Sequence, residues 1–381
     1  MSQRTQFICY RPKTILNKGK RADHWFWTRY SAYPYLGCQH GCAFCYCRER
    51  QYIPHKPKGA EAGYDAERDD FSHLIKVKEN APQLLRKALE RVPVDMLFTD
   101  DYQPAERKYK LSRQMLEVCL DLGFPAFVLT RSPLVSRDLD LFKAINERSR
   151  MVVAFSIIST PESAEYRSVS KIEGLAPSAE KRFLAMDQVA NAGILTGTVA
   201  MPLLPGLCDN NRSLQALANW TSSHGGKFIL GGGLTLADQQ KEFFIRVLGC
   251  NHPELLPLYA RLYPSGSYAQ AQPWRQTGLR IREYCQQAGI SDRMPRPIFP
   301  VEKRRLNKLI VEKLAARLYT LELENRSTNQ VWAYRKTAWA VEDLEQDIGL
   351  VYRAMGVKGL ESIPNIIPRI ASEIEALIRA D

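Results

Sequence analysis

Residues 38–45 read Cys38-Gln39-His40-Gly41-Cys42-Ala43-Phe44-Cys45, which places three thiols within eight positions. At this spacing one loop can present all three thiolates from the same side, as three corners of a cubane iron–sulfur cluster require. Gly41 has no side chain and lets the backbone bend tightly. The pattern predicts that Cys38, Cys42 and Cys45 ligate an iron–sulfur cluster, with the fourth iron open to another ligand.

A structural zinc site and unliganded thiols also remain open for these cysteines. A structural zinc site normally has four ligands, often in two separated pairs, and the chain contains no second Cys-x-x-Cys. His40 or Cys47 could supply a fourth ligand, although Cys47 stands very close to Cys45. Unliganded cysteines are the last alternative, and three of them within eight residues would be an unusual coincidence.

The chain beyond the cysteines alternates between short apolar runs and amphipathic segments. The runs expected as strands are 30–35, 94–99, 126–129, 151–158, 194–201 and 228–230. The segments expected as helices are 80–91, 111–122, 137–146, 178–192 and 211–222. A βα repeat with short connections predicts a parallel sheet. Six strands are too few for a closed eight-stranded barrel, so we expect an α/β fold, a partial (β/α)6 TIM-like barrel with reactive residues at the carboxyl ends of its strands.

Three parts of the chain differ in composition. We expect a basic, aromatic-rich N-terminal arm over 1–30, the partial barrel over 31–300, and a small all-α domain over 301–381 after the proline-rich joint 294–300. The formal net charge of +12 is concentrated early, because residues 1–60 hold eleven Lys and Arg against two acids. Such a patch suits a phosphate backbone, and the arm's aromatic side chains could stack on exposed bases. A solvated basic arm is the alternative.

The absence of long apolar runs indicates where the chain works. No run reaches the roughly 18 residues of a membrane span, and the first residues lack the apolar core of a signal peptide. We therefore expect a cytoplasmic protein with no membrane partner. In that reducing setting its nine cysteines would be thiols or metal ligands.

The residues that flank the cysteines carry a resemblance to a known family. Tyr33-Pro34-Tyr35-Leu36-Gly37 precedes Cys38, and Tyr46-Cys47-Arg48 follows Cys45. With the cysteine spacing and the aromatic Phe44, this stretch resembles the radical S-adenosylmethionine superfamily, and within it the spore photoproduct lyase-like (DNA repair photolyase-like) branch. Three further segments, 99–106, 129–138 and 202–209, also fit that branch. The resemblance spans about residues 28–295 and departs from the branch at Tyr33 and Cys47, where asparagine and a small residue are usual.

The resemblance implies a cofactor set and its contacts. Cys38, Cys42 and Cys45 would hold a [4Fe–4S] cluster whose open iron binds S-adenosylmethionine. One-electron cleavage of the sulfonium would release methionine and a 5′-deoxyadenosyl radical that abstracts a hydrogen from the substrate. The cofactor contacts would be Phe44 at the adenine, Thr99 and Asp100 at the methionine amino group, and Ser156 at a ribose hydroxyl. The alternatives are a core phenylalanine, a turn-capping aspartate and a serine bonded only to backbone.

The resemblance also implies a substrate and partners. We expect a lyase-like enzyme of DNA repair that acts on damaged or modified DNA, whose target base is unstacked to reach the radical. An electron donor such as flavodoxin or ferredoxin would reduce the cluster. No catalytic residue is assigned, and the thiols that could donate hydrogen are those of Cys47, Cys119, Cys208 and Cys250. The alternatives are radical modification of RNA or a protein side chain, and a non-catalytic, metal-stabilised nucleic-acid-binding protein.

The last part of the chain carries a second resemblance, over 306–381. Segments 311–315, 333–339 and 356–364 resemble the N-terminal helix-hairpin-helix domain of X-family DNA polymerases. In working hairpins a Gly-x-Gly turn brings backbone N–H groups to a phosphate, whereas this turn reads Asn365-Ile366-Ile367. The family's Schiff-base lysine falls on Glu373, so we expect the fold without lyase chemistry. Phosphate contacts could come from Arg335, Lys336, Lys358 and Arg369, a solvated charged face being the alternative.

Overall fold

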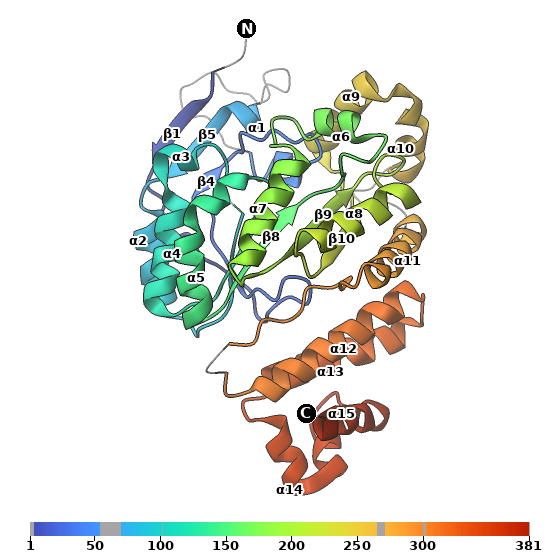
Figure 1. Ribbon diagram of the computed structural model, residues 1–381. Helices are drawn as coiled ribbons and strands as arrows, with labels where there is room; N and C mark the ends of the chain where they lie inside the picture. The colour runs from blue at the N-terminus through green and yellow to red at the C-terminus, as the bar shows by residue number, and fades with distance from the viewer. Residues whose placement is uncertain (1–3, 54–69, 101, 265–270, 300–301, 381) are drawn as a thin grey trace.

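The computed structural model describes residues 4–53, 70–100, 102–264, 271–299 and 302–380. Its centre is a curled seven-stranded sheet in the order β10-β9-β8-β7-β6-β3-β2 (Figure 1). Strands β3 and β6 to β10 run parallel, and β2 pairs antiparallel with β3 at one edge. The predicted six-stranded partial barrel is therefore confirmed, and β2 adds to it. The strands are β2 (Asn17–Lys18), β3 (Tyr30–Ser31), β6 (Leu97–Thr99), β7 (Ala126–Thr130), β8 (Met151–Ser156), β9 (Leu195–Leu203) and β10 (Ile229–Gly233).

Helices cover the outer face of this sheet. Side chains alternate between the two faces of each strand, and the outward set, such as Val128, Val153 and Ala200, packs in one apolar cluster with the helices. The predicted helices are found, with ends shifted by a few residues. The helices of this part are α1 (Asp70–His73), α2 (Ala81–Leu89), α3 (Glu106–Tyr109), α4 (Leu111–Leu122), α5 (Leu139–Arg148), α6 (Tyr166–Ile172), α7 (Ala179–Asn191), α8 (Asn211–Ser223), α9 (Asp238–Asn251), α10 (Leu256–Leu262) and α11 (Ala271–Gln287), with 3-10 turns η1 (Tyr46–Arg48), η2 (Pro133–Asp138) and η3 (Pro253–Leu255).

A second, three-stranded sheet lies beside the first and was not predicted from the sequence. Its order is β1-β5-β4, with β1 (Gln6–Tyr10), β4 (Tyr35–Leu36) and β5 (Leu74–Lys78). Strand β1 pairs parallel with β5, and β4 pairs antiparallel with β5. The cysteine segment leaves this small sheet directly from β4.

The N-terminal aromatic residues form the floor of the half-barrel. The carboxylate of Asp23 accepts hydrogen bonds from the backbone of Trp25, Phe26 and Thr28 and so fixes a tight turn. The Phe26 ring then packs on Phe98 and Phe127 of the concave face. Trp27 and Tyr30 are buried, which contradicts the expectation that these two rings stack on exposed bases. Burying the apolar area of these rings at the floor of the barrel is more favourable than leaving it exposed to solvent.

The C-terminal residues form a helical unit below the barrel in Figure 1. Its helices are α12 (Arg305–Leu323), α13 (Thr328–Asp343), α14 (Ile348–Glu361) and α15 (Pro368–Ala380). The joint that leads into this unit meets the amino ends of the barrel strands: Arg150, just before β8, donates to the Ile298 carbonyl, and the Trp27 indole donates to the Met294 carbonyl. The helical unit therefore lies at the end of the barrel opposite to the carboxyl ends of its strands.

A buried ionic cluster fixes the helical unit to the barrel. The guanidinium of Arg296 forms two hydrogen bonds with the Glu342 carboxylate, at 2.7 and 2.8 Å, and Lys308 Nζ reaches the same carboxylate at 2.8 Å. Arg296 also stacks on the Trp27 ring. Arg296 of the proline-rich joint thus contacts the helical unit through Glu342 and the barrel floor through Trp27.

The turn between α14 and α15 differs from a phosphate-binding hairpin in its packing. Asn365 takes the left-handed conformation with φ of +70°, and its carbonyl accepts a hydrogen bond from the Thr337 hydroxyl at 2.7 Å. Ile366 is buried in the core of the helical unit, while Ile367 is 45% exposed. Both oxygens of Glu373 accept from the Tyr334 hydroxyl, at 2.6 and 2.8 Å. A carboxylate, not an amine, therefore occupies this position.

Candidate functional site

The cysteine loop, residues 37–45, lies at the carboxyl ends of the barrel strands. Two glycines with positive φ, Gly37 at +82° and Gly41 at +66°, turn its backbone. Backbone hydrogen bonds tie Ala43 to Ile172 of α6 and Leu175 to His40. A Cβ on Gly174 would stand 2.6 Å from the His40 carbonyl oxygen. Since no real Cβ comes that close, a glycine is required where the loop rests on the segment after α6.

Two buried side chains from outside the cysteine motif hold the backbone of the loop. Gln103 donates from Nε2 to the Gly37 carbonyl and accepts at Oε1 from the Gln39 N–H, both at 3.0 Å. Arg48 donates to the carbonyls of Cys42 and Gly41, each at 2.8 Å. The first pair of bonds brackets Cys38, and the second fixes the turn at Cys42.

The planar group of Arg48 is itself held between aromatic rings. It lies 4.7 Å from the Phe71 ring centre and 3.8 Å from that of Phe243, and the residue is fully buried. Cation–π contact of this kind compensates part of the cost of burying the charge. The loop therefore rests on a rigid support.

The three thiols lie close enough to influence one another electrostatically. Burial raises the pKa of the Cys42 thiol to about 11, and burial together with Cys42 and Cys45 raises the pKa of Cys38. A hydrogen bond from Cys47 lowers the pKa of Cys45. The raised pKa values of Cys38 and Cys42 mean that these two thiols ionise readily only when a cation is bound to them.

The donor set of the loop indicates which metal centre it suits. Structural zinc normally takes four protein ligands, often in two separated pairs, whereas iron–sulfur clusters are held by Cys thiolates. Three thiols on one loop, with no second Cys-x-x-Cys in the chain, suit an iron–sulfur cluster better than structural zinc. Among the described residues, no group of three His, Cys, Asp or Glu side chains is placed to hold a metal ion.

A shared carboxylate neutralises two arginines beside the loop. Arg131, just after β7, pairs with Glu173, and Arg182 of α7 pairs with the same carboxylate at 2.5 Å. Burial alone would raise the pKa of Glu173, but the two guanidinium groups outweigh it and hold that pKa below its ordinary value. Two cations against one anion leave a net positive charge beside Cys42. This charge favours thiolates and the carboxylate of a bound amino acid group.

Phe44 sits on this charged group. Its ring is buried, the guanidinium of Arg131 lies 5.0 Å from the ring centre, and its carbonyl accepts from the Gln240 side chain at 2.9 Å. The neighbouring His40 is also buried, and burial lowers its pKa to about 4. His40 is therefore neutral at pH 7.

The strand-end candidates are separated by the strand alternation. Asp100 follows β6 on the concave face, the side that also carries Phe98. It is exposed to solvent, yet desolvation by the surrounding protein raises the pKa of its carboxyl to about 6. Both properties fit a carboxylate that is exposed on one side and surrounded by protein on the other. Thr99 is buried and lies on the opposite, helix-covered face, level with Val128. Its side chain is therefore turned away from Asp100.

Ser156 reaches the concave face at the end of β8. Its hydroxyl donates to the Met201 carbonyl at 3.4 Å, and its own carbonyl accepts from Arg182 at 2.7 Å. The Arg131 guanidinium also donates to the Met201 carbonyl, at 3.3 Å. Phe44, Arg131 and Ser156 thus belong to one connected group.

The candidate hydrogen-donor thiols are scattered by the fold. Cys47 hydrogen-bonds with Cys45 beside the loop. Cys119 and Cys208 are buried, and Cys250 is exposed on α9. Of these candidates, Cys47 is the one beside the cysteine loop.

The sequence interpretation missed most of the support for the loop. Gln103 and Arg131 lie inside segments that were noted only for their resemblance, and nothing local distinguished them as contacts of the loop. Glu173 and Arg182 gave no signal at all, because a charge on an amphipathic helix is ordinarily solvated.

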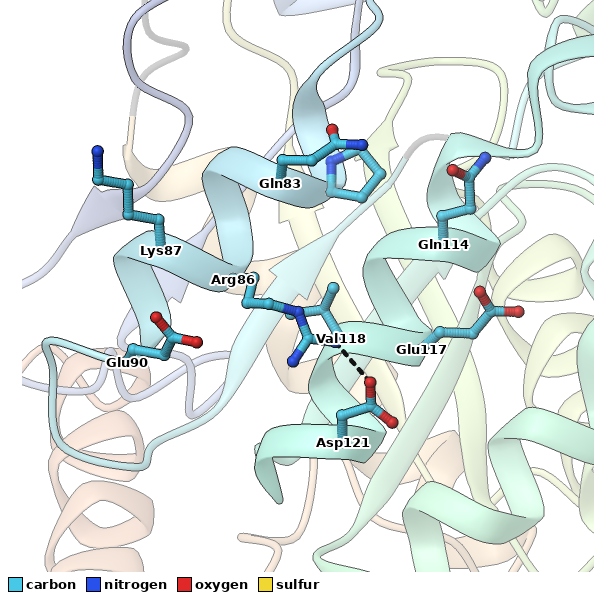
Figure 2. Close-up of a pocket in the computed structure, with 9 residues that line it drawn as sticks. Gln83, Arg86, Lys87, Glu90, Gln114, Glu117, Val118 and Asp121 are labelled. Carbon is cyan, nitrogen blue, oxygen red and sulfur yellow. Dashed lines mark hydrogen bonds and ion pairs between the residues drawn. The ribbon is translucent and has the colours of Figure 1, made fainter.

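A surface hollow between α2 and α4 is unrelated to this site (Figure 2). Its lining is mostly solvated side chains of the two helices, and Arg86 pairs with Asp121 across it at 2.5 Å. Its lining includes no residue of the cysteine loop and none of the side chains that hold that loop. No helix among the described residues is long and apolar enough to cross a membrane.

Comparison with known proteins supports the fold. No protein-family model matches the chain. An uncharacterised protein of Mycobacterium tuberculosis is 29% identical over 248 residues, which cover 63% of this chain and 68% of that protein. A radical SAM Nalpha-GlyT isomerase of Pseudomonas phage M6 is 26% identical over 204 residues, 52% of this chain and 38% of the phage protein.

A structure of spore photoproduct lyase with bound AdoMet and dinucleoside spore photoproduct superposes with a TM-score of 0.52 and 17% identity, over 74% of this chain and 80% of the lyase. The half-barrel thus shares the fold of spore photoproduct lyase. The helix-hairpin-helix likeness of the C-terminal unit stays a prediction.

Proposed function

We propose that the chain is a radical S-adenosylmethionine enzyme. The observation that carries the proposal is the cysteine loop itself: three thiols on one loop, held at Cys38 by Gln103 and at Cys42 by Arg48, at the mouth of a half-barrel with this fold. Cys38, Cys42 and Cys45 would hold a [4Fe–4S] cluster. When bound, the cluster and S-adenosylmethionine supply a 5′-deoxyadenosyl radical.

The side chains around the loop have definable tasks in this chemistry. Arg131 keeps a positive charge beside Cys42, and Phe44 offers an apolar surface next to it. Asp100, at the solvent-exposed mouth, suits a bound ammonium group when ionised. Ser156 already uses its hydroxyl on the Met201 carbonyl, so a ribose contact would require that bond to be exchanged. Thr99 would act through its backbone, because its side chain lies on the other face.

We further propose that the substrate is DNA, with a damaged or modified base as the target of a lyase-like reaction. The dinucleoside bound in the spore photoproduct lyase structure supports this class of substrate, as does the basic first part of the chain. The helical unit lies at the far end of the barrel from the loop, so any DNA contact it makes is remote from the chemistry. A flavodoxin or ferredoxin would deliver the electron.

The proposal is tested by anaerobic reconstitution with iron and sulfide, followed by dithionite and S-adenosylmethionine. We expect about four irons per chain, the count of a single cubane cluster, and production of 5′-deoxyadenosine. Cys42→Ala should lose both. Cys119→Ala is the matched control, because it removes an equally buried thiol outside the loop and should keep both. Tight zinc with no cluster at any iron loading would refute the proposal.

A further inference from the structure

We propose that one face of the small sheet beside the cysteine loop binds single-stranded nucleic acid and leads it to the site. This inference rests on the proposed function and identifies where its substrate lies. We call it the Tyr10–Lys76 face. Its members are Ile8, Tyr10, Leu36, Lys76 and Lys78.

The strand register defines this face. Ile8 is level with Lys76, Tyr10 with Lys78, and Leu36 with Lys76, so their side chains share one side of the sheet. The other side carries Phe7, Ile75, Val77 and Tyr35, which pack in an apolar cluster with residues of α3 and its flanks. Among the described residues, no buried apolar cluster includes a member of the Tyr10–Lys76 face. One side of the sheet packs into the core, and on the other side each of these five side chains is partly exposed.

The chemistry of the face suits phosphates and bases together. Lys76 Nζ lies 4.7 Å from the centre of the half-buried Tyr10 ring. Arg11 and Lys13, both exposed, follow Tyr10 along the chain, and Glu79 is the acid that follows β5. Lysines neutralise backbone phosphates, and a partly exposed tyrosine ring offers a surface on which an unpaired base can stack.

The face is continuous with the concave side of the barrel. Lys78 Nζ donates to the Tyr33 carbonyl at 2.6 Å, and the Tyr33 ring meets the Phe98 ring edge-on at 6.1 Å between centres. Phe98 is partly exposed on the concave face, and Asp100 follows two residues later on the same face. A strand laid on Tyr10 and Lys76 would therefore pass Tyr33 to reach Phe98, Asp100 and the cysteine loop.

An unpaired strand fits this path better than a duplex does. Stacking on Tyr10 and on the rings beyond it requires bases whose faces are open. A target base must also leave its stack to be reached by chemistry at a buried centre. An acidic peptide would satisfy the lysines but would leave the row of rings without a planar partner.

The proposal is tested by fluorescence anisotropy with labelled 12-nucleotide dT and rU strands, using the reconstituted, cluster-containing protein under anaerobic conditions. The variant Lys76→Ala/Lys78→Ala should weaken binding by roughly tenfold or more at 50 mM NaCl. It should also make the plot of log K against log salt shallower by about 1.4, since each lost phosphate contact on a single strand contributes about 0.7. Lys143→Ala/Lys181→Ala is the matched control, because it removes two exposed lysines from α5 and α7, and it should bind as the wild type does.

A second variant separates stacking from charge. Tyr10→Leu should weaken binding by at least about fivefold and leave the salt slope unchanged, because it removes a ring but no charge. Trp332→Leu, which removes a 43% exposed ring from the helical unit, should have no effect. Melting curves of each variant by circular dichroism confirm that the fold is kept.

Three results would overturn the inference. They are no binding of either strand by the wild type, equal binding by the face variants and their controls, and displacement of dT by poly-glutamate as efficiently as by unlabelled dT. The assay needs no turnover. Binding through this face without 5′-deoxyadenosine formation would therefore contradict the proposed function alone, and turnover without such binding would contradict this inference alone.

Discussion

Arg48 donates from Nε to the main-chain carbonyl of Cys42 at 2.8 Å, and this bond ties the middle of the cysteine loop to a side chain with no solvent exposure. The second donor of the same guanidinium holds Gly41. The position of Cys42 thus depends on a residue outside the cysteine motif. Variants of the residues around the loop test this dependence.

Arg48→Lys should loosen the loop while keeping the charge. A lysine cannot present two donors in a fixed plane, so one of the two carbonyls loses its partner. We expect a loss of about 2 kcal/mol in stability and roughly 10- to 100-fold weaker retention of iron. Thermal melting and iron release to a chelator measure the two effects. Arg107→Lys, on an exposed arginine of α3, should change neither.

Gln103→Glu should disturb the first cysteine. The carboxylate can still accept from the Gln39 N–H, but it cannot donate to the Gly37 carbonyl and repels it. A buried carbonyl without a partner costs about 1–3 kcal/mol. We expect a lower melting temperature and faster loss of the cluster absorbance in air. Gln114→Glu, which changes an exposed glutamine of α4 that donates to the Tyr109 carbonyl at the end of α3, is the control. Equal melting temperatures and equal rates of cluster loss for the two variants would contradict the proposed role of Gln103 in holding the backbone on both sides of Cys38.

Glu173→Gln should leave two buried guanidinium groups without an anion. Removing one partner of a buried ion pair costs about 3–5 kcal/mol, so the melting temperature should fall well below that of the exposed control Glu162→Gln. The freed charge of Arg131 should also tighten the binding of S-adenosylmethionine through its carboxylate. Calorimetric titration measures this second effect, and a variant as stable as the control would show that the pair contributes little.

Glu342 should make the junction of barrel and helical unit sensitive to acid. Burial alone would raise its pKa, but the two hydrogen bonds from Arg296 and the charge of Lys308 outweigh burial and lower the pKa to about 2 from an ordinary 4.5. Because the folded pKa is depressed, the stabilisation is complete above about pH 4.5 and is lost as pH falls toward 2. At 1.36 kcal/mol per pKa unit, the shift is worth about 3 kcal/mol.

The junction variant is Glu342→Gln, compared with the exposed Glu345→Gln. Urea unfolding at pH 7 should show the loss for Glu342→Gln only. At pH 3 the difference between that variant and the wild type should shrink. A difference that stays constant between pH 7 and pH 3 would contradict the assigned pKa.

Several features were fixed by short-range patterns in the chain. The spacing of Cys38, Cys42 and Cys45 specified one loop with three thiols, because neighbours along the chain cannot separate in space. The alternation of apolar runs and amphipathic segments specified six parallel strands, since each pattern matches the repeat of one element. The cofactor set and the substrate class stay predictions.

Tertiary packing decided what the sequence left undetermined. Gln103 reaches Gly37 and Gln39, and Glu173 is shared by Arg131 and Arg182, only after segments distant in sequence come together. The alternation of side chains along β6, not residue type, turned Thr99 away from Asp100. The sequence left the placement of the Trp27 and Tyr30 rings ambiguous, because an aromatic residue can pack in a core or lie on a surface. In the structure both rings are buried at the floor of the half-barrel. The local sequence thus determines the cysteine loop. Its rigidity and charge come from contacts between residues distant in sequence, which no local pattern predicts.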